Sequence, residues 1–215
     1  MAKRLDRQRQ LIANEAARIV VEQSVRDLHA AKLKAAERLG LSSRGKLPSN
    51  TDIEAAIHSH LALFGGADHN QHLQTLRAAA LEGVEFFSDF HARLVGPVLA
   101  GTADRNSPVT LHVFADSPET VGLFLSEQGI PFDETQRRLR VSRDRHENFA
   151  VYQFLAGEVA IELTALPLSS RRQAPLSPVD GKPMLRAGAA EIKALYGRWS
   201  KQRAVKALSL LGCRS

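Results

Sequence analysis

The sequence predicts an α+β protein in which an N-terminal helical region precedes a small mixed sheet flanked by helices. Three observations predict this class. Apolar residues recur at helical spacing in the first part of the chain, residues 109–115 alternate as a strand does, and residues 148–167 have the pattern of a β-hairpin. We expect a helical region at 1–90, an α+β core at 91–187, and a basic C-terminal helix and tail at 188–215.

The helical region begins with a long amphipathic stretch. Its spacing predicts helix over 5–39, divided at Ser24, because serine is a common N-cap and Asp27 follows three residues later. Gly40 is expected to end the second helix, since glycine readily adopts the left-handed conformation found just after helix ends.

Two more helices are expected before the sheet. Thr51 and Glu54 have the spacing of a capping box, and an apolar face follows them. The sequence "FGGADHN" is expected to be a break, with the next helix running from about His72 to Phe90.

The core is expected to start with strand 109–115, which presents Thr110, His112 and Phe114 on the face opposite its aliphatic residues. A helix with Pro118 at its first position follows. In the hairpin at 148–167, Ala156 and Gly157 are expected at the turn.

A proline-rich loop follows the hairpin, and its prolines exclude a central strand or helix. We expect this loop either to cross over the sheet as a packed connection or to bring Lys182 or Arg186 to an anionic ligand.

Charge is concentrated at the two ends of the chain. Residues 1–50 hold 11 Lys+Arg against 5 Asp+Glu, and residues 198–215 hold 5 against none, whereas residues 51–197 hold 13 against 18. Basic ends of this kind bind RNA or an acidic protein partner, or form solvated helix faces. One cysteine, no secretory signal and no apolar run of about 20 residues predict a cytoplasmic protein without a membrane partner.

The stretch "AGTADRNSPVTLHVF" resembles the signature of the nucleotidyltransferase superfamily, whose fold is that of DNA polymerase beta. In that family a Gly-Ser turn precedes a strand that carries an Asp-x-Asp, and a later strand adds a third carboxylate. Gly101 and Thr102 stand at the Gly-Ser position here, and Arg105 stands at a basic position often found just after it. The resemblance covers about residues 85–166 and implies a cleft that takes a nucleotide or another phosphorylated ligand.

The chain departs from the family at the metal-binding positions. Pro108 and Thr110 stand where the resemblance places the two aspartates, and Glu162 stands where it places the third carboxylate. The resemblance implies Mg²⁺ or Mn²⁺ as the cofactor, but one carboxylate is too few for the hard oxygen ligands that these ions prefer. The sequence therefore predicts no standard metal site.

The remaining candidates lie on neighbouring strands. We expect Thr110, His112 and Glu162 to share one face of the sheet. There His112 serves as an acid or base oriented by Glu162, or the two form a polar pair with a structural role. Arg138 and Arg140 share one face of a predicted extended segment, where they either read phosphates or protect an exposed edge by charge.

Two functions remain open from the sequence. The first is a degenerate nucleotidyltransferase-like protein that serves as a binding or scaffold module for a nucleotide, RNA or an acidic protein. The alternative is an active nucleotidyltransferase, or another enzyme of phosphorylated substrates, with a non-standard metal site.

Overall fold

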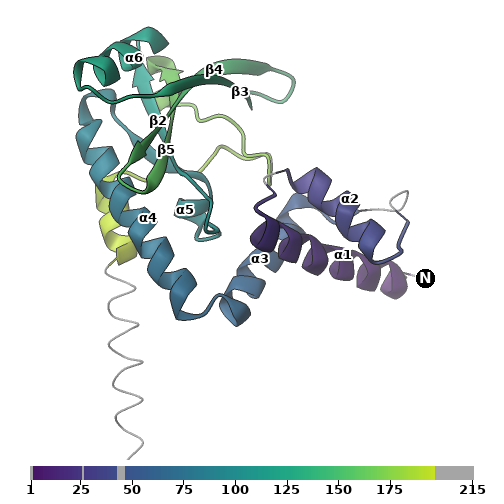
Figure 1. Ribbon diagram of the computed structural model, residues 1–215. Helices are drawn as coiled ribbons and strands as arrows, with labels where there is room; N and C mark the ends of the chain where they lie inside the picture. The colour runs from purple at the N-terminus through teal and green to yellow at the C-terminus, as the bar shows by residue number, and fades with distance from the viewer. Residues whose placement is uncertain (1, 26, 43–46, 197–215) are drawn as a thin grey trace, which may run out of the picture.

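The computed structural model describes residues 2–25, 27–42 and 47–196 and contains a five-stranded mixed sheet with helices packed beside it (Figure 1). The strand order is β1-β2-β5-β4-β3, with β2 and β5 parallel and the other three pairs antiparallel. The strands are β1 (Arg93–Val95), β2 (Val109–Ala115), β3 (Asp133–Arg140), β4 (His146–Ala156) and β5 (Val159–Pro167). This sheet, together with the helices, confirms the α+β class.

Helices occupy the first part of the chain and one face of the sheet. They are α1 (Ala2–Gln23), α2 (Leu28–Arg38), α3 (Asn50–Phe64), α4 (Gly66–Phe86), α5 (Gly96–Ala100) and α6 (Pro118–Glu127), with short 3₁₀ turns η1 (Ser88–Phe90) and η2 (Leu168–Arg171). Residues 189–196 are also helical. Among the described residues, each helix is too short or too polar to cross a membrane.

The described residues form two large hydrophobic clusters. One joins the apolar side chains of α4 and α6 to the aliphatic face of the sheet, through residues such as Leu76, Leu111 and Leu163. The other lies within α1, α2 and α3, which stand to one side of the sheet in Figure 1. The predicted domain boundary at residue 90 stays a prediction, and the apolar face of α4 packs on the sheet rather than within the α1–α3 cluster.

The helix caps differ in detail from those that the sequence predicted. Ser24 does separate α1 from α2, with a positive φ of 51°, but Asp27 is the N-cap of α2 and accepts a hydrogen bond from the His29 backbone N–H. Ser49 and Asp52, rather than Thr51 and Glu54, form the capping box of α3. At the start of each helix, two nearby residues of similar chemistry are able to serve as the N-cap, and the sequence pattern alone does not decide between them.

The glycine-rich break between α3 and α4 is much shorter than expected. Gly65 alone separates the two helices, so α4 begins at Gly66 and ends at Phe86, whereas the sequence predicted helix over 72–90. Gly66 has a φ of 59°, a left-handed conformation that glycine adopts without strain, so the chain turns from one helix into the next within two residues.

The elements of the core follow the sequence prediction closely. Strand β2 occupies 109–115 as predicted, and Pro118 is at the first turn of α6. The hairpin of β4 and β5 turns at Gly157 and Glu158, one residue later than expected.

The proline-rich segment 172–187, here called the strap, crosses from one edge of the sheet to the other. Leu176 forms an isolated bridge with Arg140 of the edge strand β3, and Ala187 forms one with Leu94 of the opposite edge strand β1. The strap also accepts a hydrogen bond from Asn50 Nδ2 of α3 at the Pro178 carbonyl, at 2.7 Å. The predicted packed crossover is therefore present.

Candidate functional site

Two parallel strands bring the predicted polar residues together on one face of the sheet. Thr110 is the register partner of Glu162, and His112 is the register partner of Thr164, so the four side chains share a face. All four are buried, with His112 only 1% exposed and Glu162 4% exposed. The expected shared face is therefore present, but it is covered rather than open to solvent.

Glu162 is held as a charged hydrogen-bond acceptor. Arg137 Nη2 donates to Glu162 Oε2 at 2.7 Å, and Gln153 Nε2 donates to Glu162 Oε1 at 3.1 Å. Both donors come from strands on the β4 side of β5. Burying an unpaired carboxylate in the protein interior costs much free energy. The ion pair with Arg137 offsets this cost for Glu162.

His112 has an arginine of its own. Arg186 Nε donates to His112 Nδ1 at 3.2 Å, so Nδ1 is the unprotonated ring nitrogen and the imidazole is neutral. Burial, followed by the charges of Arg186 and Arg137, lowers the pKa of His112 from 6.5 to about 3. A histidine with so low a pKa is a poor acid or base near neutral pH. Of the two roles that the sequence left open, the geometry thus favours the structural one for His112, with Arg186 rather than Glu162 as its partner.

Arg186 is fixed by three contacts. Besides its bond to His112, Nη1 donates to the Ser170 carbonyl at 2.6 Å, and the guanidinium carbon lies 4.9 Å from the centre of the Phe114 ring. Its remaining nitrogen, Nη2, is buried and has no hydrogen-bond partner among the described residues. The Arg186 guanidinium is therefore fixed in position, and its Nη2 is still able to donate a hydrogen bond to a ligand.

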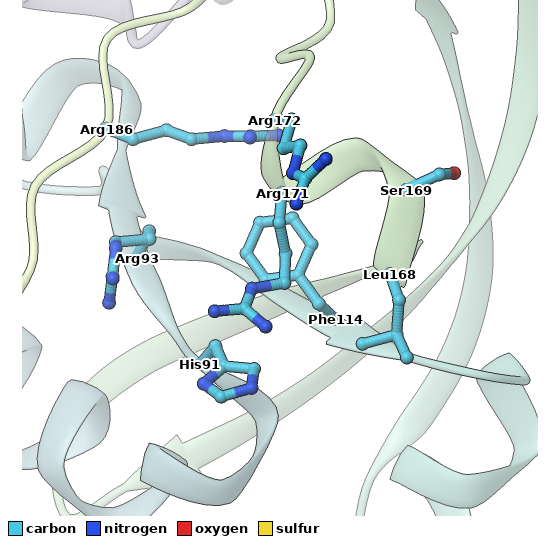
Figure 2. A pocket seen from close by; sticks show the side chains of 8 residues that line it. All are labelled: His91, Arg93, Phe114, Leu168, Ser169, Arg171, Arg172 and Arg186. Carbon is cyan, nitrogen blue, oxygen red and sulfur yellow. The ribbon is translucent and has the colours of Figure 1, made fainter.

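Arg186 lines a pocket of about 780 Å³ that is rich in arginine (Figure 2). The pocket lies where the parallel strands end, since Phe114 is near the end of β2 and the turn η2 directly follows β5. We call it the arginine pocket; its lining residues are His91, Arg93, Phe114, Leu168, Ser169, Arg171, Arg172 and Arg186. No acidic side chain is among them, and none of the four arginines forms an ion pair with another described residue.

The residues of the predicted turn lie at the other end of β2. Gly101 ends α5 with a φ of 82° and lines a separate cavity of about 320 Å³ against α3 and α4. The Thr102 backbone N–H bonds to the Pro97 carbonyl at 2.9 Å, and Arg105 is exposed in the loop before β2. The structure therefore does not bring Gly101, Thr102 or Arg105 to the arginine pocket.

The arginines of β3 divide between the two faces of the sheet. The unbroken registers place Arg137 on the face of Glu162, and hence Arg138 and Arg140 on the opposite face. Arg140 Nε donates to the Ser142 carbonyl at 3.2 Å. Arg138 and Arg140 do share a face, as expected, but Arg137 is the neighbour that reaches the candidate carboxylate.

Sequence reasoning missed most of the pocket. It named Arg186 as a possible ligand of an anion, but not His91, Arg93, Arg171 or Arg172. The paired arginines in "SSRRQ" directly after the hairpin were the available signal. Arg171 and Arg172 come near Arg93 because β1 and β5 both flank β2, and the pairing of Ala187 with Leu94 adds Arg186 to them.

The described residues do not form a metal site. Glu162 is engaged by Arg137, and no three histidine, cysteine or acidic side chains within the described ranges are grouped as a metal site requires. Three comparisons with known proteins give no further identification: no protein family, curated protein or solved structure matches this chain.

Proposed function

We propose that this chain is a binding module for a phosphorylated small molecule, built on a nucleotidyltransferase-like sheet, and that the arginine pocket takes the ligand. The observation that carries the proposal is the grouping of four arginines in one pocket that no acidic side chain lines. Guanidinium groups bind phosphate through paired N–H donors, and such charge-assisted hydrogen bonds are stronger than neutral ones.

The position of the pocket supports the same function. Ligands of open sheets with parallel strands commonly bind just beyond the carboxyl ends of those strands. The arginine pocket has that position relative to β2 and β5, and a volume of about 780 Å³ suits a small organic molecule.

The other functions that the sequence left open have less support. Metal-dependent nucleotidyl transfer needs carboxylates, and Glu162 is already paired with Arg137 at 2.7 Å. Binding of RNA or an acidic protein through the basic N-terminal segment competes with ion pairs inside that segment, where Arg18 and Arg38 both contact Glu15. The basic residues 198–215 lie outside the described residues.

Calorimetric titration with inorganic phosphate and with a nucleoside diphosphate, without divalent metal and at low salt, tests the proposal. The wild type is expected to bind, and R171Q/R172Q is expected to lose most of the affinity. R138Q/R140Q is the matched control, because it removes the same charge from the opposite face of the sheet. Equal losses in the two double variants would show that net charge, not the pocket, attracts the anion.

Thermal unfolding provides an independent measurement. A ligand that binds only the folded state at about 100 times its Kd stabilises that state by about 2.7 kcal/mol, which raises the Tm. Absence of any shift with phosphate or nucleotide at millimolar concentration, together with flat titrations, would refute the proposal.

A further inference from the structure

The edge strand β3 is open along most of its outer side. Within the described residues, β4 pairs with it on one side, and on the other side only the strap reaches it, at the bridge between Leu176 and Arg140. Figure 1 shows β3 and β4 as a ribbon that projects from the rest of the sheet. Residues 133–139 therefore form an open edge, and the backbone groups of an open edge are a template for a further strand.

The hydrogen bonds at the end of β3 show which backbone groups face the open edge. The Arg140 carbonyl accepts a hydrogen bond from the Leu176 N–H of the strap at 2.6 Å. The next residue, Val141, donates its N–H to the Arg145 carbonyl at 2.9 Å, on the β4 side. Successive residues of a strand direct their N–H and C=O groups to opposite sides, and the register of β3 with β4 is unbroken. The backbone groups of the even-numbered residues therefore face the open edge: Glu134, Gln136 and Arg138.

The side chains of these three residues have a charge pattern that is complementary to itself. An acidic, a neutral and a basic residue follow one another along one face of β3, and all three are exposed. Neither Glu134 nor Arg138 forms an ion pair with another described residue. When two identical strands pair antiparallel about Gln136, Glu134 of each copy lies directly opposite Arg138 of the other.

The strap sets the register in which a second copy fits. It already pairs with Arg140, so the open edge covers 133–139, and the midpoint of this stretch is Gln136. A two-fold axis at the midpoint uses the whole open edge and brings outward-facing backbone groups of the two copies together. An axis moved one residue toward either end places Glu134 opposite Gln136 or opposite the occupied Arg140. The midpoint register is therefore the one that matches both the backbone groups and the charges.

We infer that two copies of this chain associate through their β3 strands, antiparallel and about a two-fold axis at Gln136, so that two five-stranded sheets join into one. Glu134 and Arg138 form two equivalent ion pairs across the axis. Charges on an edge strand commonly prevent such pairing, but this order of charges attracts a second copy. The inference is independent of the proposed function, because no residue of the arginine pocket belongs to β3.

Sedimentation equilibrium of the full chain at low salt tests the association itself. An interface of two edge strands is small, so we expect a weak dimer with a Kd on the order of 10–100 μM. Measurements from about 1 μM to about 500 μM cover this range. A chain that remains monomeric at every one of these concentrations would overturn the inference.

Charge reversal tests the two ion pairs. E134R and R138E each place like charges opposite one another in both pairs, and each should raise the Kd on the order of tenfold or more. The double variant E134R/R138E exchanges the charges and should dimerise as the wild type does. An equimolar mixture of the two single variants should form a heterodimer, because acid again faces base in both pairs. E127R makes the same charge change at an exposed residue of α6 and is the matched control, with an unchanged Kd.

A disulfide tests the register. Q136C places two cysteines directly opposite one another at a Cα separation of about 5.5 Å, which is within disulfide range. In a C213S background, which removes the one native cysteine, Q136C should cross-link readily under mild oxidation. T135C is the matched control and should cross-link much more slowly, because its two copies lie diagonally across the axis. A dimer that survives both single charge reversals, or T135C cross-linking as fast as Q136C, would overturn the inference.

Discussion

Acidification provides a direct test of the buried histidine at the centre of the polar face. Burial, with the charges of Arg186 and Arg137, lowers the pKa of His112 from 6.5 to about 3. In the unfolded chain the pKa returns to about 6.5. Between these two values the unfolded state binds a proton that the folded state does not, so the free energy of unfolding must fall as the pH falls.

The size of the effect follows from this difference. Each pH unit between the two pKa values costs about 1.4 kcal/mol of stability. Acidification from about pH 7.5 to pH 5 should therefore remove about 2 kcal/mol, and the full loss approaches about 5 kcal/mol near pH 3. The whole contribution is present above pH 6.5 and is lost progressively below it.

Urea denaturation of the wild type and of H112N at the two pH values isolates this contribution from all other titrations. Asparagine keeps an acceptor for Arg186 but does not titrate, so H112N should lose about 2 kcal/mol less than the wild type on acidification. H91N, at an exposed histidine, is the control and should behave as the wild type does. Equal losses in the wild type and H112N would refute the burial and the neutral state of His112.

Three further predictions concern stability. R137M should lower the free energy of unfolding by about 2–4 kcal/mol, because Glu162, which is 4% exposed, then loses its charged partner. In urea denaturation R137M/E162Q should recover most of this loss. An R137M variant as stable as the wild type would contradict the pairing. D27A should cost about 1 kcal/mol in the same measurement, because Asp27 caps α2, whereas D27N should cost little; equal effects would exclude the cap. Y152F should lower the free energy of unfolding by about 1 kcal/mol, because the buried Tyr152 hydroxyl donates a hydrogen bond to the Pro118 carbonyl at 2.8 Å. An unchanged Tm would show that this hydrogen bond contributes nothing.

The sequence was sufficient for the core elements because their signals are local. Strand β2 alternates without interruption, and Pro118 marks the first turn of α6. The shared face of Thr110 and Glu162 followed from strand periodicity alone, and the parallel register confirms it. Helix ends were less predictable, because Ser24 and Asp27 offer competing caps within one turn.

The arginine pocket was beyond sequence reasoning because its residues are distant in the chain. Arg93 follows α4, Arg171 and Arg172 follow β5, and Arg186 lies near the end of the strap. Proline excludes regular structure in the strap but does not predict its path. Only the pairing of Ala187 with Leu94 at the far edge of the sheet returns Arg186 to the strands.

Hydrogen-bond chemistry explains why a buried histidine suits the position next to Arg186. A protonated imidazole has no acceptor, so only a neutral histidine is able to receive the Nε hydrogen of a guanidinium. The same burial that makes His112 a poor acid or base therefore makes it a dependable acceptor for Arg186. Glu162 has a parallel role, since it neutralises Arg137, whose charge otherwise adds to those around His112. The two residues that most resemble catalytic groups, His112 and Glu162, thus position Arg186 and balance the charge of Arg137.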